Sequence, residues 1–226
     1  MAVKLIEAGE SAIILSLSYD NTGEAVTATR ALYEFARGFP GIVSGLCGLD
    51  AVLLEHSDAF DADQFLKAIE AKKTVVKHQA KSAPLRVPIC YEKPFAKDID
   101  SVTNTTGMAK AELIALHQSL TYEVWMVGFM PGFPYMGELP KRLQLERKAT
   151  PDPLIPGGSV AIAEEYVGIY PFDSPGGWHV IGRTPWVIID YSKSRPSLFE
   201  AGMRVQFYAI SEEEFRKNTK APGHKD

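Results

Sequence analysis

Residues 122–137 read Tyr122-Glu-Val-Trp-Met-Val-Gly-Phe-Met-Pro-Gly-Phe-Pro-Tyr-Met-Gly137. From this stretch onward, prolines and glycines are dense and helical periodicity disappears, so short strands joined by tight turns are expected. Several short strands at such spacing indicate a barrel or a sandwich. The predicted strands are Tyr122–Gly128, Ser159–Ala163, Tyr166–Ile169, Trp178–Gly182, Trp186–Ile189 and Arg204–Tyr208.

Residues 1–84 follow a different pattern, in which β-rich runs alternate with amphipathic stretches. Apolar residues at helical spacing predict helices over Gly23–Arg37 and Asp61–Gln79. The order β-β-α-β-β-α indicates a small sheet covered by helices. The predicted strands are Val3–Ala8, Ala12–Ser16, Ile42–Leu46 and Ala51–Leu54.

The polar segment Gln79–Pro84 ends in proline and marks the predicted boundary between two domains. A strand over Leu85–Cys90 and a helix over Ala109–Ser119 are expected after it. The fold class is therefore α+β, with a small N-terminal α/β sandwich domain at 1–84 and a β domain at 85–210. Residues 211–226 form a charged tail that is expected to fray after one helical turn.

Composition narrows the functional classes. The 226 residues carry 24 Lys+Arg against 28 Asp+Glu, for a net charge of −4, and 46% of them are hydrophobic. This is typical of a soluble globular protein. No apolar run approaches the ~20 residues of a membrane span, and the N-terminus does not resemble a signal peptide, so a cytoplasmic protein is expected. A pI of ≈ 5.8 argues against nucleic-acid binding. Cys47 and Cys90 are predicted to be reduced thiols, and no metal site is expected.

The most unusual segment is Gly128–Gly137, because its prolines restrict the backbone while its glycines permit turns closed to other residues. A stiff loop that presents aromatic side chains at low conformational cost suits a ligand ring or a partner chain. A hydrophobic plug over one end of a barrel is an equally good interpretation. The candidate binding residues in this loop are Phe129, Pro131, Gly132, Phe133, Tyr135 and Met136.

Two glycine-rich turns precede strands. Gly158 and Ser159 stand where the backbone can approach a ligand, although a tight hairpin entry explains them equally well. The second turn, Ser174-Pro-Gly-Gly177, leads into a strand that carries Trp178 and ends at Arg183. A planar arginine donor suits a carboxylate or phosphate, and a structural salt bridge is the alternative.

The roles of further candidate residues depend on where the fold places them. If Arg142, Arg147 and Lys148 gather near Arg183 they form an anion site, and otherwise they are a solvated face. His117 is interpreted either as a hydrogen-bonded histidine at a packed edge or as a catalytic group.

No phosphate loop, dinucleotide fingerprint, zinc-protease motif or nucleophile elbow is found in the sequence. Other motifs, however, closely resemble one bacterial family, named variously KipI-type kinase inhibitor, allophanate hydrolase subunit 1 and the B-type subunit of 5-oxoprolinase (PxpB). The matching runs are His117, Tyr122-Glu-Val124, Gly128–Gly137, Ile155–Ala163, Gly168-Ile-Tyr-Pro171 and Ser174–Pro185.

The resemblance implies a C-terminal cyclophilin-like β-barrel and a chain that does not act alone. Beside a KipA-type partner, which is the C-type subunit of 5-oxoprolinase, and an A-type subunit, it would help open 5-oxo-L-proline to L-glutamate with ATP, bound at the level of the complex. Arg183, supported by Arg147, would hold phosphate or carboxylate, and His117 would carry a proton. The isolated chain would be inactive.

The chain also departs from the family pattern. Glu164, Glu165 and Tyr166 stand where the family commonly has glycines and a small polar pair, and His179 replaces an asparagine, so the exact substrate stays open. Two other functions are therefore considered, inhibition of a sensor histidine kinase and a carboxyltransferase-like role in urea or allophanate metabolism. Prolyl isomerase activity would rest on the fold alone.

Overall fold

The computed structural model describes residues 3–71 and 83–218. The chain divides into two compact units, residues 1–81 and 82–226, which we call unit 1 and unit 2.

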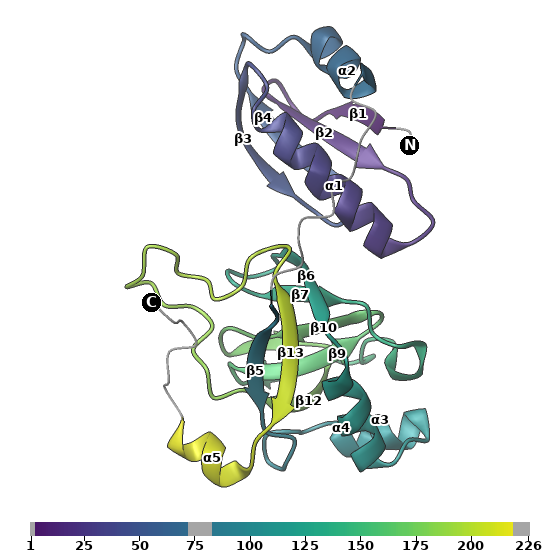
Figure 1. The fold of residues 1–226 in the computed structure, drawn as a ribbon, viewed down its shortest axis with the longest axis vertical. Coiled ribbons are helices and arrows are strands. Elements are labelled where there is room, and N and C mark those ends of the chain that lie inside the picture. Colours follow the sequence, from purple (N-terminus) through teal and green to yellow (C-terminus); the bar gives the residue numbers. More distant parts are fainter. Residues whose placement is uncertain (1–2, 72–82, 219–226) are drawn as a thin grey trace. The chain divides into compact units, whose positions relative to one another are not determined.

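Unit 1 is a four-stranded antiparallel sheet with strand order β1-β2-β4-β3 and two helices (Figure 1). Asn21 accepts a hydrogen bond from the Glu24 backbone N–H at 2.8 Å, which caps the first helix. Alternate residues of β2 and β4 pack with both helices in one apolar core. The elements are β1 (Val3–Glu7), β2 (Ala12–Leu17), α1 (Thr22–Ala36), β3 (Ile42–Cys47), β4 (Ala51–His56) and α2 (Ala62–Ala71).

Unit 2 contains a seven-stranded sheet with order β12-β9-β10-β7-β6-β13-β5, and β5 and β13 are its parallel pair (Figure 1). Cys90 and Arg183 exchange backbone hydrogen bonds of 2.9 and 3.0 Å, which join the two ends of this order into a nearly closed barrel. The strands are β5 (Leu85–Ile89), β6 (Tyr122–Val127), β7 (Pro134–Gly137), β9 (Ser159–Ala163), β10 (Tyr166–Ile169), β12 (His179–Arg183) and β13 (Arg204–Ala209).

Helices and a small hairpin complete unit 2. Its remaining elements are α3 (Ile99–Thr106), α4 (Lys110–Ser119), η1 (Lys141–Leu143), β8 (Asp152–Ile155), β11 (Ser174–Gly176) and α5 (Glu212–Lys217). β8 and β11 pair with each other apart from the barrel sheet. Phe215 of α5 is buried against Phe95 and Cys90.

The predicted α+β class, with a small N-terminal α/β domain followed by a β-barrel, is confirmed. The predicted strand Trp186–Ile189 is wrong, because this proline-interrupted stretch forms isolated bridges, such as that between Ile189 and Ser197, and no strand. The prediction of a stiff loop over Gly128–Gly137 is only partly correct, because the second part of this segment, Pro134–Gly137, is strand β7. The sequence missed α3, β8 and β11. The predicted helix from Asp61 extends beyond α2 into residues 72–79, which lie outside the described residues.

Candidate functional site

A pocket of about 190 Å³ lies in unit 2 beside the end of β12. Its walls are mainly apolar, and its polar members are Lys97, Ser159 and Arg183. The described lining residues therefore supply two cations and one hydroxyl group, with no carboxylate among them. They are Pro94, Phe95, Lys97, Leu154, Ile155, Pro156, Ser159, Val180 and Arg183.

Arg183 is positioned by both its main chain and its side chain. Its backbone closes the barrel against Cys90, and its Nε donates a 2.7 Å hydrogen bond to the Gly157 carbonyl oxygen. Among the described residues, no hydrogen bond or ion pair engages its two terminal amino groups. Burial lowers the pKa of Arg183, but the guanidinium stays charged at neutral pH because the ordinary pKa of arginine lies far above neutrality. The geometry leaves the planar end of the cation available to a ligand.

The glycine turn before β9 is built around the same arginine. Gly158 has φ +82°, and a Cβ there would lie 2.6 Å from the Thr184 carbonyl oxygen and 3.6 Å from Arg183 Cγ. The Gly157 N–H donates to Asp173 Oδ1 at 2.7 Å. A tight turn and a close backbone approach are therefore both present. Ser159, which is 1% exposed, follows directly and lines the pocket.

Arg142, Arg147 and Lys148 do not join Arg183 at the pocket. Arg147 Nε lies 3.2 Å from Glu164 Oε1, and Arg142 pairs with Glu112 at 2.7 Å. Glu164 has a φ of +54°, in the left-handed region that favours glycine. Glu164 therefore adopts a glycine-type backbone conformation and forms an exposed ion pair with Arg147.

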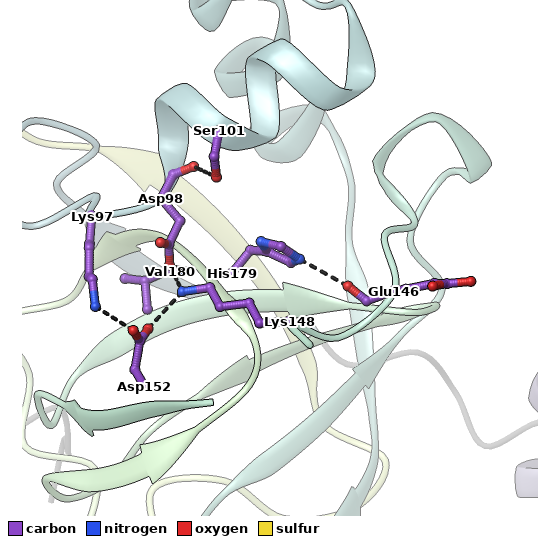
Figure 2. Close-up of polar contacts among 8 residues, drawn as sticks. All are labelled: Lys97, Asp98, Ser101, Glu146, Lys148, Asp152, His179 and Val180. Carbon is purple, nitrogen blue, oxygen red and sulfur yellow. Dashed lines mark hydrogen bonds and ion pairs between the residues drawn. The ribbon is translucent and has the colours of Figure 1, made fainter. Parts of the chain in front are cut away.

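Lys148 belongs to a charge network that sequence reasoning missed (Figure 2). Its Nζ lies 2.6 Å from Asp98 Oδ2 and 2.7 Å from Asp152 Oδ2. The other oxygen of Asp152 accepts a 2.6 Å hydrogen bond from Lys97, which lines the pocket. The partners are separated by up to 55 positions in sequence, so no local spacing could have revealed the contact.

The aromatic residues of the Phe129–Met136 segment separate in space. Phe133 and Tyr135 pack with Trp178 over the outer side of the barrel sheet, with ring centroids 5.4 Å and 5.7 Å from that indole. Met136 is instead buried in the barrel core. Phe129 is 67% exposed and has φ +69°.

The two remaining loop candidates differ in their surroundings. Pro131 is exposed, whereas Gly132 is buried with φ +77°. A Cβ at Gly132 would lie 2.3 Å from Ile189 Cδ1. Neither these residues nor the aromatic face lines the Arg183 pocket. Their role in ligand or partner binding stays a prediction.

His117 lies in the apolar interior and is fully buried. Its Nδ1 is 2.7 Å from the Tyr91 hydroxyl oxygen, and its ring stacks on Phe207 with centroids 4.7 Å apart. Burial lowers the pKa of His117 to about 3, so the imidazole is neutral at pH 7. His117 does not line the pocket. The geometry favours the interpretation of a packed, hydrogen-bonded histidine, and its role as a proton carrier stays a hypothesis.

Within residues 3–71 and 83–218, no three His, Cys, Asp or Glu side chains group as a metal ion would require. The helices in these ranges are also too short or too polar to cross a membrane.

The chain matches the model of the carboxyltransferase domain, subdomain C and D, over residues 3–199. It is 40% identical over 131 residues to the B-type subunit of 5-oxoprolinase from Bacillus subtilis (strain 168), which covers 58% of this chain and 55% of that protein. It is 32% identical over 211 residues to the B-type subunit of 5-oxoprolinase from Haemophilus influenzae, covering 91% and 97%, respectively. A putative urea carboxylase of Emericella nidulans is 30% identical over 138 residues, 56% of this chain and 11% of that protein.

Solved structures share the fold. TTHA0988 is similar with a TM-score of 0.74 and 28% identity, over 88% of this chain and 40% of that one. The uncharacterized protein PH0987 from Pyrococcus horikoshii has a TM-score of 0.56 and 26% identity, over 94% of this chain and 100% of its own. The Kluyveromyces lactis urea carboxylase, at 21% identity and a TM-score of 0.67, covers 95% of this chain and 22% of its own and shares the fold. The resemblance drawn from the sequence motifs is confirmed.

Proposed function

This chain belongs to the family of the carboxyltransferase domain, subdomain C and D, and from that premise we propose that it is one component of a multi-subunit 5-oxoprolinase complex. The names of the Bacillus and Haemophilus relatives support this assignment. The complex opens the lactam ring of 5-oxo-L-proline to L-glutamate at the expense of ATP. The partners are a KipA-type protein, which is the C-type subunit of the complex, and an A-type subunit. The isolated chain is inactive.

The observation that carries the proposal is the Arg183 pocket. A guanidinium with both terminal amino groups available forms paired hydrogen bonds to a carboxylate, a geometry that an ammonium group cannot provide. The apolar walls around Arg183 exclude water and strengthen such a contact. We assign Arg183 to the carboxylate of 5-oxo-L-proline.

The size of the pocket supports the proposal that the nucleotide binds to another subunit. Pockets for drug-sized ligands measure roughly 300–1,000 Å³, whereas this one measures about 190 Å³. A small organic acid fits that volume and a whole nucleotide does not. The partner subunits therefore bind ATP in this proposal, consistent with the lack of a phosphate loop in the sequence.

The chemistry explains why fixed cations are useful. An unactivated lactam is a poor electrophile, and transfer of the terminal phosphoryl group of ATP to its carbonyl oxygen creates a leaving group. Water then adds to that carbon, and the C–N bond breaks as the nitrogen takes a proton, which leaves an acyl phosphate. A second water hydrolyses this acyl phosphate to L-glutamate and inorganic phosphate. Negative charge develops at the carbonyl oxygen, and preorganised donors stabilise it. This chain contributes such donors at its pocket.

The test is glutamate formation from 5-oxo-L-proline and ATP by the reconstituted complex. The chain alone and the partners without it should form no glutamate, and the full mixture should form it. Arg183→Ala should lower kcat/KM by about 10- to 100-fold, because a hydrogen bond to a charged group contributes about 1.5–3 kcal/mol. Arg183→Lys should recover only part of the activity.

The matched control is Arg142→Ala, because Arg142 pairs with Glu112 and lies outside the pocket. Activity of Arg183→Ala equal to that of the wild type, in a complex shown by gel filtration to assemble, would rule out the anion-binding role. An assembled but silent wild-type mixture would rule out the 5-oxoprolinase assignment.

A role in urea metabolism is the second candidate, favoured by the similarity to the putative urea carboxylase. The same mixture supplied with urea, bicarbonate, ATP and a biotinylated carrier protein tests it. Inhibition of a sensor histidine kinase remains an untested prediction, and binding of the free chain to such a kinase without any KipA-type partner would support it.

A further inference from the structure

Lys97 is the second cation of the Arg183 pocket, although it falls outside the motifs that mark the family. It follows β5 in the segment that also supplies Pro94 and Phe95 to the pocket wall. Its side chain is 52% exposed, so the ammonium is accessible to a ligand from solvent. Its Nζ donates a 2.6 Å hydrogen bond to Asp152 Oδ1.

The contacts around Asp152 hold the Lys97 ammonium in place without using all of its N–H donors. Asp152 is 18% exposed, and its other oxygen contacts the ammonium of Lys148 at 2.7 Å. Lys148 is itself anchored to Asp98, whose Oδ2 also accepts a 2.8 Å hydrogen bond from the Val180 N–H (Figure 2). Because an ammonium has three N–H donors and Asp152 takes one, Lys97 retains donors for a ligand.

The charges in this network balance among themselves. Asp98 and Asp152 carry two negative charges, and Lys97 and Lys148 carry two positive ones. Arg183 adds a positive charge to the pocket, and Asp173 interacts with it electrostatically without a direct ion pair among the described residues. A ligand anion therefore meets Arg183 as a cation whose terminal amino groups form no direct ion pair among the described residues, and Lys97 as a prepositioned cation.

We propose that Lys97 is a second ligand-binding residue of this pocket, positioned by Asp152, and that the pocket takes small organic acids with negative charge at two ends. Applied to ring opening, the inference rests on the proposed function: Arg183 holds the carboxylate, and Lys97 faces the carbonyl oxygen on which charge develops. Lys97 then acts mainly in the transition state, whereas Arg183 also binds the ground state.

The first experiment measures steady-state kinetics of the reconstituted complex. Lys97→Met should lower kcat by about tenfold, as expected for loss of a hydrogen bond to a charged group, while KM for 5-oxo-L-proline changes by less than about twofold. Lys97→Arg, which keeps the cation, should recover part of kcat. Lys93→Met is the matched control, because Lys93 pairs with Asp100 at 2.5 Å and lies outside the pocket. Wild-type kcat in Lys97→Met, or an equal loss in Lys93→Met, would overturn the proposal.

The second experiment requires no reaction. The full chain is titrated by NMR with glutarate, which has two carboxylates, and with butyrate, which has one. The wild type should bind glutarate about fivefold more tightly, as expected for one added ion pair worth up to about 1 kcal/mol. Lys97→Met should abolish this preference, and Arg183→Ala should weaken binding of both acids.

The two experiments separate failure of the inference from failure of the proposed function. A silent complex with a glutarate preference that depends on Lys97 would reject the 5-oxoprolinase assignment and retain the two-cation pocket. An active complex whose free chain shows no glutarate preference, or one that survives Lys97→Met, would reject the inference alone.

Discussion

His117 should make the stability of unit 2 depend on pH, because its imidazole is buried in the neutral form. The ring is enclosed by Tyr91 and Phe207, and burial lowers its pKa from 6.5 to about 3. In the unfolded chain the same side chain titrates at its ordinary pKa. Between these two values the unfolded state binds one proton more than the folded state, so acid favours unfolding.

The magnitude follows from that difference. One pKa unit corresponds to about 1.4 kcal/mol, so the stabilisation is fully present above pH ~6.5 and is lost as the pH falls toward 3. Lowering the pH from 7.5 to 5 should remove about 2 kcal/mol from the free energy of unfolding through His117 alone. Over the full interval between the two pKa values, the loss in the free energy of unfolding amounts to about 5 kcal/mol.

Urea unfolding followed by tryptophan fluorescence measures this effect in unit 2 alone, because all three tryptophans, Trp125, Trp178 and Trp186, lie there. The variant His117→Gln stays neutral at every pH and should lose less stability between pH 7.5 and 5 than the wild type. The difference between the two pH slopes isolates His117 from the carboxylates that both proteins share. Equal slopes, or an NMR titration of the His117 ring near pH 6.5 in the folded protein, would refute the reasoning.

Three further variants test local features of unit 2. Glu164→Gly should stabilise the protein by about 1 kcal/mol because it relieves a φ of +54°, whereas Glu164→Ala should not; thermal unfolding compares them. Lys148→Met should destabilise unit 2 by about 3 kcal/mol at pH 7, because it leaves two largely buried carboxylates without their shared cation. The loss of stability should shrink in acid. Equal urea midpoints for Lys148→Met and the wild type at pH 7 would contradict this. Gly132→Ala should lower the free energy of unfolding more than Gly107→Ala does. Both glycines have positive φ, but only at Gly132 would a Cβ lie within 2.3 Å of Ile189. Equal losses of stability against urea would refute the steric argument.

Local patterns predict the elements whose residues carry their own signal. A helix is expected over Gly23–Arg37 and α1 is found over Thr22–Ala36, because its apolar spacing and the cap at Asn21 are both local. Helix α3 is missed, since Ile99–Thr106 is rich in Ser, Thr, Asn and Asp, which favour caps and turns. Its burial of Ile99 and Val102 in the barrel core outweighs that preference.

The candidate site likewise combines a residue that the sequence marks as a candidate with residues that only the fold brings together. The sequence marks Arg183 as a candidate because a planar arginine donor at the end of a strand suits a carboxylate or phosphate, and the structure places it beside the glycine turn at Gly158. Lys97 and Asp152 carry no such signal, because charged residues on exposed segments look alike until the chain folds. The grouping of Arg147 with Arg183 rests on shared charge alone, and the structure pairs Arg147 with Glu164 instead.

The sequence alone determined that this chain is an α+β protein with a β-rich second half, and its motifs identified the family. These properties depend on periodicity, on backbone restrictions by proline and glycine, and on runs of residues, all of which are local. The tertiary structure decided which side chains share a pocket, because strands distant in sequence close the barrel through Cys90 and Arg183. It also decided that His117 is buried and neutral, since desolvation is set by everything packed around a group rather than by its neighbours in the chain.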